Sequence, residues 1–83
     1  MISNPKADKN VKGSVGAPMP GTVVAIRVEE GETVIKGQPL IILSAMKMEM
    51  IVQAPVAGVI QKISVSKDKK LEAGDLIIEI KEN

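Results

Sequence analysis

Apolar residues occur along the chain in short runs that glycine and proline interrupt, and this pattern predicts β-strands. Between residues 22 and 28, alternation places Val24, Ile26 and Val28 on one face of a strand, with Val59, Ile63 and Val65 on the matching face further along. The expected strands are 22–28, 33–35, 40–44 and 75–80. Every stretch long enough for a helix contains Gly or Pro and lacks capping signals, so no helix is expected.

The chain repeats itself at a fixed offset of 37 residues, without a gap, between 17–43 and 54–80. Because the matches include two glycines and an Ala-Pro pair, chance similarity in a chain rich in Ile and Val explains them poorly. A fixed period indicates a repeated structural unit. We therefore expect an all-β fold, a flattened eight-stranded barrel or sandwich of two duplicated four-stranded halves, each burying one face against the other. The identical pairs are Ala17/Ala54, Pro18/Pro55, Gly21/Gly58, Ile26/Ile63, Val28/Val65, Gly37/Gly74 and Ile41/Ile78.

The ends of the chain differ from this pattern. Residues 1–15 are polar and contain Pro5, Gly13 and four charges, which is typical of a flexible linker or tail. The folded domain is expected to span 16–81. Within it, Asp68 stands where the first half has Gly31, and Asp tolerates unusual turn geometry better than most residues.

The composition excludes several kinds of chemistry. The chain has no His, Cys, Phe, Tyr or Trp, so it holds neither a Ser-His or Cys-His nucleophile pair nor a His/Cys zinc site, and we expect no catalytic residues and no metal. A net charge of +1 without stacking aromatics argues against nucleic acid as a partner. The longest aliphatic run, Leu40 to Leu43, is far shorter than the ~20 residues of a membrane helix. We expect a soluble, intracellular domain that binds no membrane.

The segment from Ser44 to Met50 has no counterpart in the repeat and joins two expected strands, so it should form a hairpin tip. Two-residue hairpin turns require φ > 0 at both central residues and therefore favour Asn-Gly or Asp-Gly. Here the central residues are Met46 and Lys47, which gain nothing from that conformation. A local rule broken at one place often marks a functional site.

Met46 and Met48 flank Lys47, and Met50 follows two residues later. A lone loop lysine is usually a solvated side chain, and methionines usually fill irregular gaps in a core. Three adaptable apolar side chains around one lysine instead favour a surface that a partner protein contacts.

The tetrapeptide Ala45-Met46-Lys47-Met48 resembles the attachment motif of biotin carboxyl carrier domains, in which the lysine is amide-linked to biotin. The resemblance covers roughly residues 16–81. The run Gly-Ala-Pro-Met-Pro-Gly at 16–21 and Leu-Ser at 43–44 are similar to the carboxyl-terminal carrier domain of pyruvate carboxylase. Short matches at 5–7, 11–13 and 66–68 resemble the animal type of that enzyme.

The resemblance implies a carrier with biotin covalently attached to Lys47. Ala45, Met46 and Met48 would be the residues that biotin protein ligase recognises, with Glu49 supporting the turn. The carrier would move a carboxyl group from an ATP- and bicarbonate-using biotin carboxylase domain to a carboxyltransferase domain, where pyruvate becomes oxaloacetate, and would catalyse neither step. An animal-type enzyme implies the mitochondrial matrix, and other types imply the cytoplasm.

Other functions fit parts of the pattern. The chain resembles carriers of other acyl-CoA carboxylases or decarboxylases, and also lipoyl domains, whose lysine is usually preceded by Asp rather than by a residue such as Met46. A plain β-sandwich interaction module would leave Lys47 unmodified. An enzyme using Lys47 as a Schiff-base nucleophile would need that lysine in a desolvated pocket, and a hairpin tip does not provide one.

Overall fold

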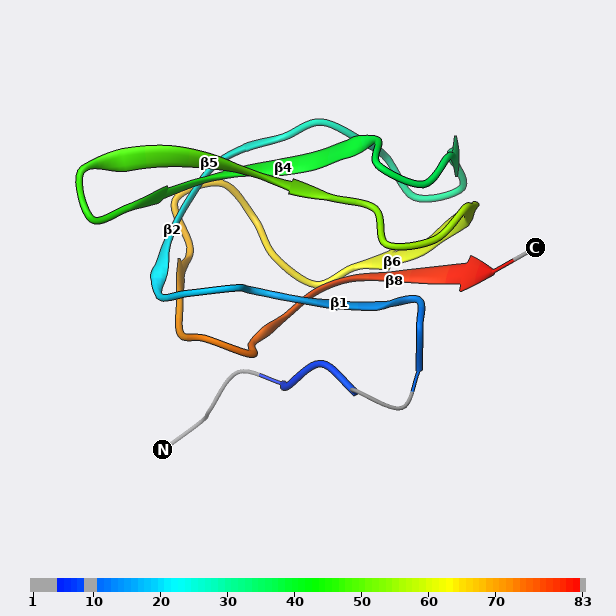
Figure 1. Ribbon diagram of the computed structural model, residues 1–83, viewed down its shortest axis with the longest axis horizontal. Helices are drawn as coiled ribbons and strands as arrows, with labels where there is room; N and C mark the ends of the chain where they lie inside the picture. Colours follow the sequence, from blue (N-terminus) through cyan, green and yellow to red (C-terminus); the bar gives the residue numbers. More distant parts are fainter. Residues whose placement is uncertain (1–4, 9–10, 83) are drawn as a thin grey trace.

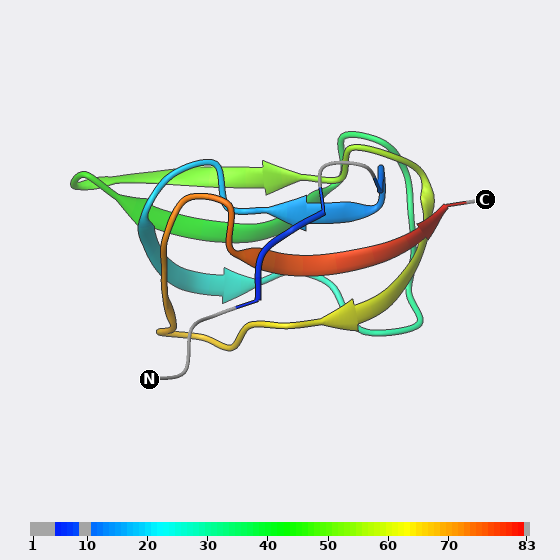
Figure 2. The same ribbon diagram turned by 90° about the horizontal axis from the view of Figure 1, so that it is seen from below.

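The computed structural model describes residues 5–8 and 11–82, and within these residues it contains strands, turns and no helix. Two four-stranded antiparallel sheets pack face to face, as Figures 1 and 2 show from perpendicular directions. This confirms the expected all-β sandwich. The strands are β1 (Ser14–Gly16), β2 (Gly21–Ile26), β3 (Thr33–Val34), β4 (Pro39–Ala45), β5 (Met48–Gln53), β6 (Gly58–Ile63), β7 (Lys70–Leu71) and β8 (Leu76–Glu82).

The two duplicated halves, β1–β4 and β5–β8, are interlocked. The sheet orders are β1-β8-β6-β3 and β5-β4-β2-β7, so each sheet takes two strands from each half, and neither half forms a sheet alone. Residues 37 positions apart make the same pairs: Val15 lies opposite Ile78, and Val52 lies opposite Ile41. The sequence repeat is therefore a repeat of strand register.

The core is aliphatic, and its most buried side chains come from both halves. Alternation had placed Val24 on one face of the strand with Ile26 and Val28, whereas Val23 is fully buried and Val24 is only half-buried. The register shifts between Val23 and Ala25, which marks a β-bulge, and a bulge reverses the in–out alternation of the residues that follow. A matching shift follows Ile60, which is buried, whereas Val59, expected on one face with Ile63 and Val65, is half-buried. The large side chains exposed by less than 2% include Leu40, Ile41, Leu43, Ile60, Ile77 and Ile78.

The described fold begins before the predicted domain start at Gly16. Strand β1 starts at Ser14, and Val15 is buried within the core. Pro5 and Ala7 also form backbone hydrogen bonds with the barrel. Residues 1–4, 9 and 10 of the predicted linker lie outside the described residues, and the flexibility of the linker stays a prediction.

Candidate functional site

Strands β4 and β5 form a long hairpin that projects from one end of the molecule, at the left in Figure 1. Ala45 pairs with Met48, so the turn between them consists of two residues. Met46 has φ 51° and Lys47 has φ 66°, both in the left-handed region. The expected hairpin tip, with Met46 and Lys47 as its two central residues, is therefore confirmed.

The tip holds this conformation although neither residue favours it. For L-residues other than Gly, a left-handed conformation costs roughly 1–2 kcal/mol each. The register of β4 against β5 leaves no other length for the turn. Gly21 of β2 supports the hairpin from below, because a Cβ placed there would lie 2.7 Å from the Ser44 carbonyl oxygen and 3.2 Å from the Ala45 Cβ. Packing beneath the tip thus fixes a backbone that the local sequence disfavours.

The predicted attachment residues lie together at this tip, but they are not equivalent. Lys47 is exposed, and its neighbours Met46 and Met48 are 85% and 73% exposed. Ala45 is buried, at 7% exposure, so its side chain packs under the turn and does not form part of the outer surface. Glu49 is exposed and lies opposite Ser44 across the hairpin.

A small apolar pocket of about 170 Å³ lies beside the tip. Met19, from the loop before β2, lines it together with methionines 46, 48 and 50. Met50 is half-buried and packs against the core. The sequence pattern pointed to the three hairpin methionines, whereas Met19 reaches them through the fold.

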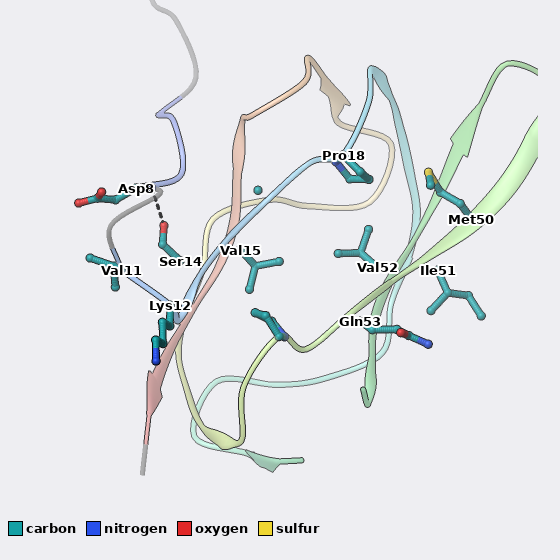
Figure 3. Close-up of a pocket in the computed structure, with 12 residues that line it drawn as sticks. Asp8, Val11, Lys12, Ser14, Val15, Pro18, Met50, Ile51, Val52 and Gln53 are labelled. Carbon is teal, nitrogen blue, oxygen red and sulfur yellow. Dashed lines mark hydrogen bonds between the residues drawn. The ribbon is translucent and has the colours of Figure 1, made fainter. Parts of the chain in front are cut away.

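A larger groove, of about 570 Å³, lies between the edge strands β1 and β5, and sequence reasoning missed it. Val15 and Val52 point into the space between these strands (Figure 3), and they occupy equivalent positions of the repeat. The amide of Asp8 donates to the Ser14 hydroxyl at 2.8 Å at the rim of this groove. No sequence motif marked this place, because it forms where the edges of two separate sheets meet.

Sequence reasoning also missed a buried carboxylate. Asp75, in the turn before β8, is fully buried and accepts a hydrogen bond from the Lys6 ammonium, and it also accepts the Glu72 amide at 2.8 Å. The hydrogen bond to Asp75 raises the pKa of Lys6 above its ordinary value. A polar residue in an expected turn gave no signal of burial, and a lysine in an expected tail gave no signal of pairing.

Two further searches covered only the part of the chain that the structure describes. No helix there has the length and apolar character needed to cross a bilayer. No group of three or more Asp, Glu, His or Cys side chains is arranged there to hold a metal ion.

Comparison with known proteins matches residues 13–80 to a family described as "Biotin-requiring enzyme". The chain is 58% identical over 80 residues to the mitochondrial pyruvate carboxylase of Mus musculus, and 50% identical over 76 residues to the pyruvate carboxylase of Staphylococcus aureus. These alignments cover 96% and 92% of this chain, but only 7% of either relative. The chain therefore spans less than a tenth of the length of these relatives.

Two solved structures share the fold. A single-chain, multi-domain long-chain acyl-CoA carboxylase superposes with a TM-score of 0.81 and 28% identity, over 95% of this chain and 8% of that chain. The urea carboxylase of Kluyveromyces lactis superposes with a TM-score of 0.77 and 29% identity, over 96% of this chain and 7% of that chain.

Proposed function

The chain belongs to the family of biotin-requiring enzymes, as its resemblance to carrier domains predicted, and we propose that it is the biotin carboxyl carrier domain of a pyruvate carboxylase-like enzyme, with biotin attached to Lys47. The observation that carries this proposal is the hairpin tip. There, an exposed lysine is placed at the extremity of a rigid barrel by a two-residue turn with positive φ.

The residues of the tip fit covalent attachment of biotin. An amide link to the ε-amine needs a lysine that a second protein can reach, and Lys47 is exposed at a projecting turn. Met46 and Met48 supply exposed apolar surface on both sides, suited to contact with biotin protein ligase. Ala45 acts differently, since its small buried side chain permits the close approach of β2 beneath the turn.

Attached biotin supplies a ureido nitrogen that accepts and donates a carboxyl group. The chain itself contributes presentation and effective concentration, since a tethered carrier makes each transfer between two sites intramolecular. Its partners in this function are the ligase and the biotin carboxylase and carboxyltransferase domains of the parent enzyme. The carrier catalyses neither transfer, and by analogy with the pyruvate carboxylases that it matches, the acceptor is pyruvate and the compartment of an animal-type enzyme is the mitochondrial matrix.

The test is the intact mass of the chain after incubation with biotin protein ligase, ATP and biotin. We expect a gain of one biotin less one water in the wild type and no gain in Lys47→Arg. A matched control is Lys36→Arg, which alters another exposed lysine beside a turn with positive φ and should gain the same mass as wild type. A folded wild-type chain that gains no mass would overturn the proposal, and lipoylation would then be tested in the same way.

A further inference from the structure

The carboxylate of Asp75 has no exposed surface. An ionised carboxylate taken out of water is costly unless charged or hydrogen-bonding groups compensate it. Here the ammonium of Lys6 lies against it, and the Glu72 amide donates to its other oxygen at 2.8 Å. The Glu72 carboxylate also lies 4.0 Å from the same ammonium. Two side chains that are 69 positions apart in the sequence thus meet as an ion pair.

The backbone around Lys6 is also held. Pro5, Lys6 and Ala7, called here the N-terminal strap, run antiparallel to the chain just before β8. The Ala7 amide donates to the Gly74 carbonyl at 2.9 Å, and the Leu76 amide donates to the Pro5 carbonyl at 2.8 Å. The strap also packs against β1, because a Cβ placed on Gly16 would lie 2.8 Å from the Ala7 Cβ.

The equivalent turn of the first half has the same backbone bonds without a buried acid. Gln38 occupies the position of Asp75, and its side-chain oxygen accepts the Ile35 amide at 3.1 Å, as Asp75 accepts that of Glu72. An uncharged amide side chain is therefore sufficient to form this turn. What the charge of Asp75 adds to this turn is its ion pair with Lys6 of the strap.

We propose that Lys6 and Asp75 form a releasable latch that holds the N-terminal strap on the barrel. The Lys6 side chain is 55% exposed, so water and ions reach one member of the pair. Release adds these three residues, about 10 Å at full extension, to the chain ahead of the barrel. The consequence for the reach of a tethered carrier rests on the proposed function, whereas the latch itself does not involve biotin.

Amide hydrogen exchange followed by NMR on the 83-residue chain tests the latch. In Lys6→Met, we expect the amides of Ala7 and Leu76 to exchange roughly ten- to a hundred-fold faster than in wild type, because a hydrogen bond to a charged group is lost. The amides of Gly37 and Ala54, which are hydrogen-bonded in the corresponding turn of the first half, should keep wild-type rates. Lys12→Met removes a positive charge from an exposed lysine that lies near the strap in sequence but outside it, and it should change none of these rates.

Strap amides that exchange no faster in Lys6→Met than in Lys12→Met would overturn the proposal. If Lys6→Met instead accelerates all amides together, because the buried Asp75 carboxylate has lost the Lys6 ammonium, the double variant Lys6→Met/Asp75→Asn decides. Fast strap amides on an otherwise protected barrel then support the latch. Strap amides as slow as in wild type, or a barrel that loses protection as a whole, contradict it. Since no readout involves biotin, failure of the latch and failure of the carrier function are separate results.

Discussion

The turns at 35–38 and 72–75 occupy equivalent places in the two halves, and their backbones are bonded alike. The Gly37 amide donates to the Ala54 carbonyl and the Gly74 amide to the Ala17 carbonyl, each at 2.8 Å. Gly37 and Gly74 have φ of 88° and 86°. Duplication has therefore preserved the turn down to single hydrogen bonds.

The side chains of the two turns have different partners. Gln38 donates from its amide nitrogen to the Glu32 carboxylate at 3.3 Å, within its own half. Asp75 instead binds Lys6, which lies outside both repeats. One change from an amide to an acid thus turns a local contact into an attachment point for a distant segment. The difference shows that a repeated backbone can make an asymmetric contact through a single side chain.

The hairpin tip is a second departure from symmetry. The loop from β4 to β5 connects the halves, so the repeat provides no equivalent turn within the residues that the structure describes. Turns inside the halves take positive φ at Gly31, Gly37 and Gly74, where glycine adopts it without strain, and at Asp68. At the tip, Met46 and Lys47 take positive φ and bear its cost. Repeat partners in the core pair in the same register, so we expect them to contribute alike to stability, whereas the tip has no equivalent.

The largest expected effect comes from substitutions in the core, which test whether equivalent positions of the two halves contribute equally to stability. Ile41 and Ile78 are repeat partners, and both are fully buried. Ile41→Ala and Ile78→Ala should each lower the free energy of unfolding by about 2–5 kcal/mol, through lost burial and a residual cavity. Denaturant unfolding measures both values. They should agree within about 1 kcal/mol, and a wider difference would break the energetic symmetry of the halves.

Ile51 provides the control for these variants. It lies on β5, is 55% exposed, and has the same side chain. Ile51→Ala should change the free energy of unfolding by no more than about 0.5 kcal/mol, as is usual for surface positions. Should an alanine variant of the core fail to fold, Ile41→Val and Ile78→Val make the same comparison at about 0.5–1.5 kcal/mol.

An intermediate effect is expected at the tip. Met46→Gly relieves a left-handed conformation and should raise the free energy of unfolding by about 1 kcal/mol, the cost of placing an L-residue there less the entropy that glycine loses. The same substitution removes an exposed methionine beside Lys47, so modification by biotin protein ligase should slow. Met48→Gly is the matched control for stability, because Met48 is in a strand and glycine relieves no left-handed conformation there. If Met46→Gly is more stable than wild type but is modified at the same rate, Met46 is not part of the surface that the ligase recognises.

The sequence predicted the repeated strands and the hairpin tip, and it missed features that depend on strand register or on contacts between distant segments. Identities 37 positions apart located the strands, and the motif around Lys47 located the tip. The shared face predicted for Val24, Ile26 and Val28 failed at Val24, because a bulge after Val23 is a property of register and leaves no mark in the apolar pattern. The burial of Asp75 was missed because it depends on Lys6, and pairing across 69 residues has no local signature. The groove between β1 and β5 was missed because it forms between the edges of two sheets, and contacts between distant segments have no local signature.

The smallest expected effect concerns the one turn in which the second half lost its glycine. Asp68 has φ 73°, and its repeat partner Gly31 has φ 89°. This confirms that Asp adopts the geometry left by the missing glycine. Asp is among the residues that enter the left-handed region most readily, so the strain is smaller here than at Met46. Asp68→Gly should therefore raise the free energy of unfolding by only several tenths of a kcal/mol.

Gly31→Asp makes the reverse exchange in the first half and should lower the free energy of unfolding by a similar amount. Space does not limit it, because a Cβ on Gly31 would meet no atom within 4 Å. The added carboxylate would lie beside Glu30 and Glu32, whereas Asp68 lies between Lys67 and Lys69, so the comparison is made at high salt, which screens these charges. Thermal unfolding of both single variants and of the double exchange gives the measurement. Equal and opposite shifts that cancel in the double variant would show that the two turns carry the same conformational strain. A large loss in Gly31→Asp alone would show instead that the turn after β2 tolerates less distortion than its copy after β6.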